Sequence, residues 1–158
     1  YPGNGGILVA LLMHHVKLQP GQALYLGAGN VHAYLGGTGF EVMSSSDNVV
    51  RAAFTQKNIN IDEFLNVAHL ASITSPLVEA TQLGDGVWQY PVGTARFGTQ
   101  RIDVSGSHDV RATHDAEIVV CTAGNAGALT AGQAAVLRNG ETVSLSGNAT
   151  VFRTWGTR

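Results

Sequence analysis

Side chains able to do chemistry gather between residues 32 and 57 of the sequence. His32 follows a glycine-rich turn at the start of a predicted strand, a setting that gives an imidazole the rigid position that a metal ligand needs. Glu41 supplies a carboxylate that can carry a proton. Arg51 and Lys57 are two of only nine cations and lie within seven residues of each other, as the binding of a phosphate dianion requires. One short stretch therefore holds candidates for a metal ligand, an acid–base group and the cations of an anionic substrate site.

The remaining histidines favour structural interpretations. His14 and His15 are adjacent, so on a strand they would face opposite sides and could not both ligate one ion. His69 falls on a predicted helix, and His108 and His114 flank a polar loop. We expect none of these five to be a metal ligand.

Short apolar runs separated by turn residues predict an all-β protein, and 20 of the 158 residues are glycine. One helix is predicted over residues 61–72. Asp62 and Glu63 lie in its first turn, where carboxylates complement the helix dipole, and an apolar stripe recurs at Ile61, Leu65, Ala68 and Ala71. Strands are predicted before this helix at 7–13, 16–18, 23–26, 32–35, 40–43 and 49–55, and after it at 87–92, 101–104, 117–121, 134–137, 142–145 and 150–153.

An internal repeat links the two β segments. The run at residues 21–29 aligns with 132–140 at an offset of 111, with identities at residues 21, 22, 23, 26, 29 and 36. His32 of the first copy corresponds to Val143 of the second, which indicates a functional unit beside a structural one that holds no metal. Chance recurrence of Gly-Gln-Ala before a strand remains the alternative.

Composition excludes several classes of protein. The net charge of −2 gives no basic face for nucleic acid, and two lysines cannot form a polybasic membrane segment. The longest apolar run, Ile7 to Met13, is too short to span a bilayer. Cys121 is the single cysteine and is expected to be a small buried hydrophobe, as in a protein of the reducing cytoplasm. The start at Tyr1, without a methionine or a signal-like segment, is typical of an excerpt from a longer protein.

Two family patterns are present. Residues 21–34 resemble the second motif of cupins, in which a glycine, a strand and a turn precede a metal-ligating histidine; Gly27 replaces the proline of that motif. The runs AGNVHAYL (28–35), FEVM (40–43) and SDNVVRAAFTQK (46–57) resemble the type I phosphomannose isomerases with their spacings intact. The resemblance extends, more weakly, to the C-terminal end of the chain.

The resemblance implies a fold, an activity and roles for residues. The fold would be all-β, with two cupin-like (jelly-roll or β-sandwich) units joined by one short helix and with the first unit incomplete without an N-terminal half. Residues 1–60 would be the last strands of the catalytic domain, 61–86 the helix and linker, and 87–158 the second domain. The enzyme would interconvert mannose 6-phosphate and fructose 6-phosphate at one zinc ion by proton transfer between C1 and C2. His32 would ligate the zinc, Glu41 and Arg51 would be catalytic, and the phosphorylated hexose would be bound by Tyr34, Asp47 and Lys57.

Some alternatives stay open. The family's other zinc ligands, a Gln-x-His pair and a glutamate, have no counterpart in this chain, so we expect it to be inactive without the missing N-terminal part. Glu41 could instead pair with a buried cation or ligate the metal, and Asp47 could instead anchor the turn at residues 44–48. A non-catalytic cupin-like module that binds sugars or holds an assembly together is the competing function. A metal oxygenase is disfavoured, because the His32-x-Tyr34 pattern lacks the second histidine of a facial triad.

Overall fold

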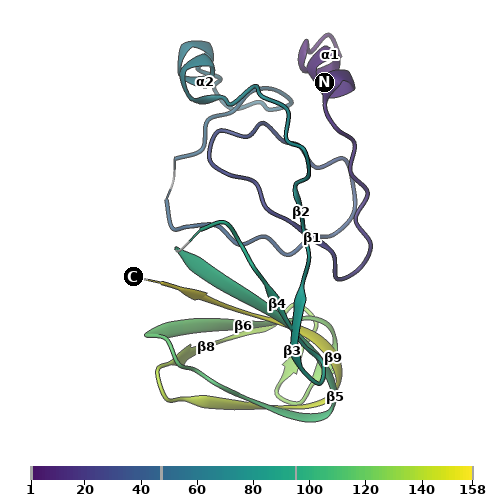
Figure 1. Ribbon diagram of the computed structural model, residues 1–158, viewed down its shortest axis with the longest axis vertical. Helices are drawn as coiled ribbons and strands as arrows, with labels where there is room; N and C mark the ends of the chain where they lie inside the picture. Colours follow the sequence, from purple (N-terminus) through teal and green to yellow (C-terminus); the bar gives the residue numbers. More distant parts are fainter. Residues whose placement is uncertain (1, 47, 95, 158) are drawn as a thin grey trace. The chain divides into compact units, whose positions relative to one another are not determined.

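Residues 2–46, 48–94 and 96–157 are described by the computed structural model (Figure 1). In chain order, their helices and strands are α1 (Gly6–Leu12), β1 (Ala23–Leu24), α2 (Ile61–Val67), β2 (Leu77–Val78), β3 (Thr81–Gly84), β4 (Val87–Tyr90), β5 (Phe97–Arg111), β6 (Ala116–Ala126), β7 (Leu129–Thr130), β8 (Ala134–Arg138) and β9 (Thr142–Gly156). None of the described helices is long and apolar enough to cross a membrane.

The chain divides into two units. The first consists of Tyr1–Gln19, Leu26–Gly37 and Ser45–Pro76 and carries both helices. The second consists of Pro20–Tyr25, Thr38–Ser44 and Leu77–Arg158 and carries the strands. The domain boundaries expected after residues 60 and 86 stay a prediction.

The second unit is built on one antiparallel sheet, with β1 and β2 forming a separate two-stranded ladder. The strand order is β3-β4-β5-β9-β6-β7. In addition, β8 pairs with β6 along the edge that does not pair with β9. The strands β5 and β9 are each 15 residues long and pair from Phe97↔Gly156 to Arg111↔Thr142. The mostly β, antiparallel fold predicted from the sequence is confirmed, and each strand predicted between residues 87 and 153 lies wholly or largely within an observed one.

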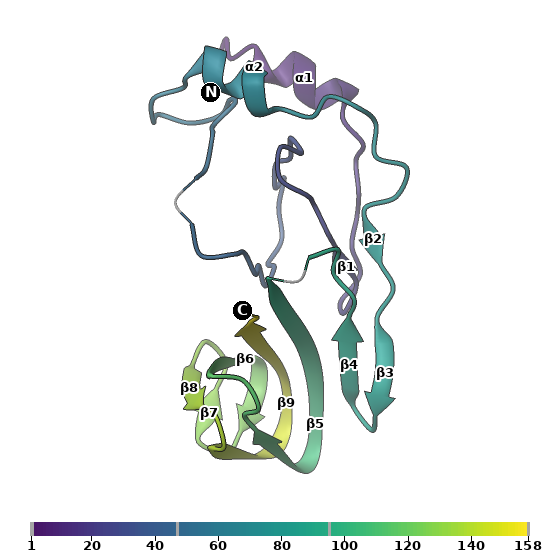
Figure 2. The ribbon, with the colours of Figure 1, turned by 60° about the vertical axis from the view of Figure 1, so that its left-hand side comes forward.

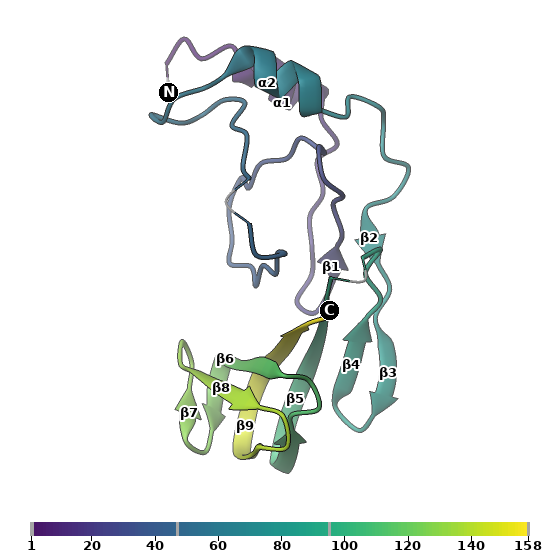
Figure 3. The ribbon, with the colours of Figure 1, turned by 90° about the vertical axis from the view of Figure 1, so that its left-hand side faces the viewer.

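Two facing glycines lie within the long paired strands β5 and β9, which curve strongly in Figures 2 and 3. Gly106 pairs with Gly147, and their φ angles are 91° and 118°, a region that side-chain-bearing residues rarely adopt. By alternation both positions fall on the inward side of their strands, but both glycines are exposed, as at a corner where paired strands turn. The bend allows one sheet to enclose an apolar interior.

The core of this unit comes from alternate residues of the bent strands. Its buried members are Ile102, Val104, Val110, Ala112, Val119, Cys121, Ala126, Leu129, Leu137, Leu145 and Val151. Cys121 is a free cysteine with no exposed surface, which confirms its interpretation as a small core hydrophobe. Val143, the counterpart of His32 in the repeat, packs against the same core.

The repeat has a structural counterpart in the backbone. Gly21 and Gly132 have φ angles of 83° and 89°, and Gly29 and Gly140 have 82° and 87°. A strand begins two residues after Gly21 and two residues after Gly132. The copies differ in extent, because β1 has two residues and β8 has five.

The predicted helix begins at the expected residue and ends earlier than expected. The Asn60 side chain caps α2 by accepting a hydrogen bond from the Glu63 N–H at 3.0 Å. Ala68 turns to an extended conformation, and the His69 N–H donates to the Gly29 carbonyl at 2.8 Å. The chain therefore leaves the helix at Val67 to make a bridge with the turn before His32, and residues 68–72 are not helical.

Several strands predicted in the first 60 residues are wrong. Residues 7–12 belong to the helix α1 instead. Leucine and alanine make up four of the seven residues of its sequence GILVALL and favour helix where no strand pairs with the segment. Residues 16–18, 32–35, 40–43 and 49–55 form no ladder, and only Ala23–Leu24 of 23–26 does. A strand needs a partner strand to satisfy its backbone, and the described chain supplies none to these segments.

Candidate functional site

The turn before His32 is fixed from two sides within the first unit. The Asn30 N–H donates to the Gly27 carbonyl at 3.3 Å, and the Gly29 carbonyl accepts from His69. A β-carbon at Gly29 would lie 2.5 Å from the Val67 carbonyl oxygen at the end of α2, so only glycine fits there. The glycine of the motif thus lets the end of α2 close onto the turn that presents His32.

The ring of His32 is oriented by its own backbone. His32 is exposed, and its Nδ1 lies 2.9 Å from the carbonyl oxygen of Asn30. Because a carbonyl oxygen only accepts, Nδ1 carries the proton and a neutral ring keeps its lone pair at Nε2. This is the arrangement in which a histidine ligates a metal through Nε2 while a carbonyl holds its other nitrogen.

Tyr34 lies beside His32 even though residues 32–35 do not form the predicted strand. The two ring centroids are 6.2 Å apart at an interplanar angle of 73°. The two side chains are therefore neighbours through an edge-to-face ring contact, without the support of a strand.

Of the other predicted residues, Glu41 belongs to one unit and Arg51 and Lys57 to the other. Glu41 is exposed and belongs to the second unit, in a segment anchored by the stacking of Phe40 on Phe152 at 4.6 Å. Arg51 and Lys57 are exposed and belong to the first unit. Within the described part of the chain, no ion pair involves these three side chains. Asp47 lies outside the described residues.

The donor set for a metal is incomplete within the described ranges. No group of three or more His, Cys, Asp and Glu side chains that could hold a metal ion occurs among the residues described. A catalytic zinc ion usually takes three protein ligands. His32 fits one ligand position, and this chain's described residues fit no complete zinc site.

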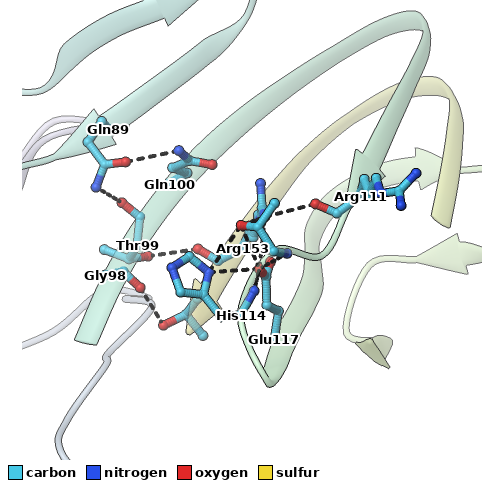
Figure 4. Close-up of polar contacts among 10 residues, drawn as sticks. Gln89, Gly98, Thr99, Gln100, Arg111, His114, Glu117 and Arg153 are labelled. Atoms are coloured by element: carbon cyan, nitrogen blue, oxygen red, sulfur yellow. Dashed lines mark hydrogen bonds and ion pairs between the residues drawn. The ribbon is translucent and has the colours of Figure 1, made fainter. Parts of the chain in front are cut away.

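A second polar cluster, which the sequence did not reveal, lies inside the second unit (Figure 4). Glu117 has no exposed surface. Its Oε1 accepts from the Thr113 N–H at 2.7 Å, the His114 N–H at 3.0 Å and the His114 Nδ1 at 2.9 Å. Arg153 donates through Nη2 to Oε1 at 2.9 Å and through Nε to Oε2.

The electrostatics of Glu117 follow from these donors. Burial alone raises the pKa of its carboxyl, but the hydrogen bonds from Arg153, the Thr113 N–H and the His114 ring and N–H outweigh burial and lower the pKa to about 2. Donors from Thr113, His114 and Arg153 occupy both carboxylate oxygens, so little acceptor capacity is left for a substrate. The cluster ties the loop between β5 and β6 to β9 and is structural.

Strand alternation could have revealed this carboxylate. Glu117, Val119 and Cys121 are the buried residues at alternate positions of β6, so a carboxylate in that register faces the core. No feature of the sequence names its partner, because Arg153 is 36 residues away. Trp155 completes the cluster by stacking on the His114 ring at 4.8 Å.

A shallow hollow of about 260 Å³ also lies on the second unit, lined by Pro20, Gly21, Arg101, Asp103 and Thr150. Asp103 pairs with Arg101 at 3.0 Å, and the Arg101 guanidinium lies over the Trp88 ring at 5.3 Å. Because Asp103 already neutralises this cation, the hollow is not suited to a phosphate dianion.

Solved structures define the class of fold. Mutant forms of phosphomannose isomerase from Salmonella typhimurium superpose with TM-scores of 0.51 and 0.52 at 22–23% identity, covering 72% of this chain and 32% of theirs. The covered part is the C-terminal part of that enzyme. The chain therefore has the fold of this portion of a phosphomannose isomerase.

The sequence is similar to one part of several mannose-6-phosphate isomerases. The mannose-6-phosphate isomerase of Escherichia coli K12 is 34% identical over 154 residues, which covers 94% of this chain and 38% of the relative. That of Salmonella typhimurium is 33% identical over 158 residues, 99% of this chain and 40% of the relative. Mannose-6-phosphate isomerase 1 of Arabidopsis thaliana is 39% identical over 90 residues, 57% of this chain and 21% of the relative. No family model matches the sequence.

The chain is thus homologous, over nearly all of its length, to one part of the mannose-6-phosphate isomerases. It spans about two fifths of the length of the two bacterial relatives.

Proposed function

We propose that this chain is part of a zinc-dependent mannose-6-phosphate isomerase that interconverts mannose 6-phosphate and fructose 6-phosphate. The observation that carries the proposal is the 34% identity over 154 residues with the Escherichia coli enzyme of that name. The exposed, oriented ring of His32 supports it, because this histidine lies in the run AGNVHAYL.

His32 would hold the zinc ion through Nε2, with the Asn30 carbonyl keeping the proton on Nδ1. The remaining ligands would come from the part of the isomerase outside this chain, in accord with the lack of a three-ligand group in the described residues. Bound zinc would polarise the sugar oxygens as a Lewis acid.

The chain's own side chains would handle the proton and the negative charges. The Glu41 carboxylate would take the proton from C2 of the open-chain aldose and return it to C1 of the same sugar, while the hydroxyl proton on O2 passes to O1. Arg51 would stabilise the negative charge that develops on the enediolate oxygens. Lys57 would bind the phosphate, and Tyr34, beside His32, would contact the sugar with Asp47.

Complementation tests the proposal. The chain would be mixed with a polypeptide comprising the part of the Escherichia coli enzyme that it does not match, and isomerase activity and bound zinc would be measured. We expect neither part to be active alone, and the mixture to be active with one zinc ion. His32→Ala should lose both properties, while His15→Ala, a control at another exposed histidine, should keep them. A stable, zinc-free and inactive mixture would contradict the proposal.

The second candidate is a non-catalytic cupin-like module that binds sugars or holds an assembly together. The incomplete donor set of the described residues favours it. It predicts that mannose 6-phosphate binds equally well with and without zinc, and that His32→Ala binds as the parent does.

A further inference from the structure

The first unit lacks an interior of its own. Among its described residues, not one is buried, whereas the second unit contains a complete apolar core. A folded unit must bury an apolar face against something to offset the loss of chain entropy. The described residues of the first unit therefore need a surface outside themselves.

Its two helices expose the apolar surface that such packing would use. In α1, Leu8, Leu11 and Leu12 are 69%, 77% and 88% exposed. In α2, Ile61 and Leu65 lie one turn apart on one face and are 66% and 61% exposed. Of the apolar stripe predicted for this helix, only Ile61 and Leu65 lie on α2, because Ala68 and Ala71 follow its end, and the side chains of Ile61 and Leu65 are both exposed.

A membrane is a poor occupant for this surface. The seven residues of α1 span about 10 Å, one third of a bilayer's hydrocarbon core. A helix that lies on a membrane carries basic residues along a polar face, and α1, with the sequence GILVALL, carries no charge at all. A short helix that is apolar on all sides is typical of a protein interior.

We propose that α1 and the Ile61–Leu65 face of α2 dock onto the portion of the isomerase that lies outside this chain. This inference rests on the proposed function. The occupant follows from two observations, the match to only 38–40% of the length of the bacterial relatives and the absence of a core in the unit that carries His32. The partner's face is apolar, since α1 offers no charge to pair with.

Docking would also organise the segment that carries the cations. A β-carbon at Gly6, the first residue of α1, would lie 2.4 Å from the Ala53 Cβ and 3.2 Å from the Phe54 ring. The start of α1 is thus packed closely against residues between Arg51 and Lys57. A partner that binds α1 would therefore also hold residues 51–57 in place.

Binding measurements test the surface. The unmatched portions of the Escherichia coli and Salmonella typhimurium enzymes would be titrated with this chain by calorimetry, and hydrogen exchange of α1 would be followed. We expect a 1:1 complex, slower exchange in α1, and at least tenfold weaker binding for each of Leu8→Glu, Leu11→Glu and Leu12→Glu. Leu83→Glu, on β3 and 58% exposed, is the matched control and should bind as the parent does.

Each outcome decides the inference. Because no residue of α1 is buried, the substitutions remove no core contact, and circular dichroism would verify that each variant keeps the fold of the parent. No complex with either partner, or equal binding by the α1 variants and the control, would overturn the inference. Self-association of the chain that the α1 substitutions abolish would also overturn it, in favour of a second copy as the occupant.

The same experiment separates this inference from the proposed function. A complex that depends on α1 but neither binds zinc nor isomerises mannose 6-phosphate would contradict the function alone. An active mixture that tolerates all three α1 substitutions would contradict the docking surface alone.

Discussion

The Glu117 carboxylate and the Arg153 guanidinium form a two-pronged ion pair inside the sheet of the second unit. Arg153 Nη2 lies 2.9 Å from Oε1, and its Nε donates to Oε2. The pair joins β6 to its neighbour β9, where Val119 faces Arg153 in the ladder. A carboxylate with no exposed surface and so many donors keeps its charge to very low pH.

Acid should destabilise the second unit through this carboxylate. The pKa of Glu117 is lowered from 4.5 to about 2, so its contribution is fully present above pH 4.5 and is lost as pH falls toward 2. A shift of this size corresponds to about 3 kcal/mol. Urea unfolding measured between pH 6 and pH 2 should show that the free energy of unfolding of the parent protein falls as the pH is lowered below 4.5. This fall is called the acid slope.

A pair of variants isolates the effect. Glu117→Gln should cost about 3–5 kcal/mol at pH 7, because it leaves Arg153 without its partner charge, and should flatten the acid slope. Glu79→Gln, at an exposed residue, should change neither. An acid slope in Glu117→Gln equal to that of the parent would show that other groups cause it.

Alanine at the two corner glycines should have unequal effects. At Gly147 a β-carbon would lie 2.6 Å from the Asn125 carbonyl oxygen and φ is 118°, whereas at Gly106 φ is 91° and no atom lies within 4 Å. We expect about 1–3 kcal/mol of destabilisation from backbone strain at both, and a larger loss at Gly147 because of the clash. Thermal unfolding of both, with Gly156→Ala as the unstrained control, measures the difference. Equal stabilities for Gly147→Ala and Gly156→Ala would contradict the conclusion that the backbone at Gly147 requires glycine.

Metal removal should act through His32 in the complemented enzyme. We expect a chelator to abolish isomerase activity and zinc to restore it, while magnesium should not, because magnesium prefers oxygen ligands to imidazole. The chelated His32→Ala complex should stay inactive when zinc is added. Restoration of that variant to parental activity would place the metal on other residues.

The two cations should differ in steady-state kinetics. In the complemented enzyme, Arg51→Ala should lower kcat by about 10²–10³, the effect of losing a donor that acts mainly in the transition state. Lys57→Ala should mainly raise KM, because a phosphate contact acts in the ground and transition states alike. The reverse pattern would exchange the two roles. Near-normal kinetics for both would place these side chains outside the site.

The second half of the fold could be predicted from the sequence because its signals are local. Period-two alternation such as Val119 and Cys121, interrupted by glycine turns, predicts strands whichever neighbour they pair with. The same alternation carries Glu117 to the core. The ion pair of Glu117 with Arg153 is seen only in the tertiary structure. The two residues are 36 positions apart, and no local sequence pattern indicates that they pair.

In the first half of the chain, the sequence indicated the candidate site better than it predicted the secondary structure. The sequence by itself showed the resemblance to the phosphomannose isomerases, through the runs that hold His32, Glu41 and Arg51, and it placed the start of α2. Tertiary structure decided that residues 6–12 form a helix and that residues 32–35 form no ladder, because a strand exists only where another strand satisfies its backbone groups. The apolar run GILVALL is helical although none of its residues is buried, and the run by itself does not encode whether a partner strand lies beside it.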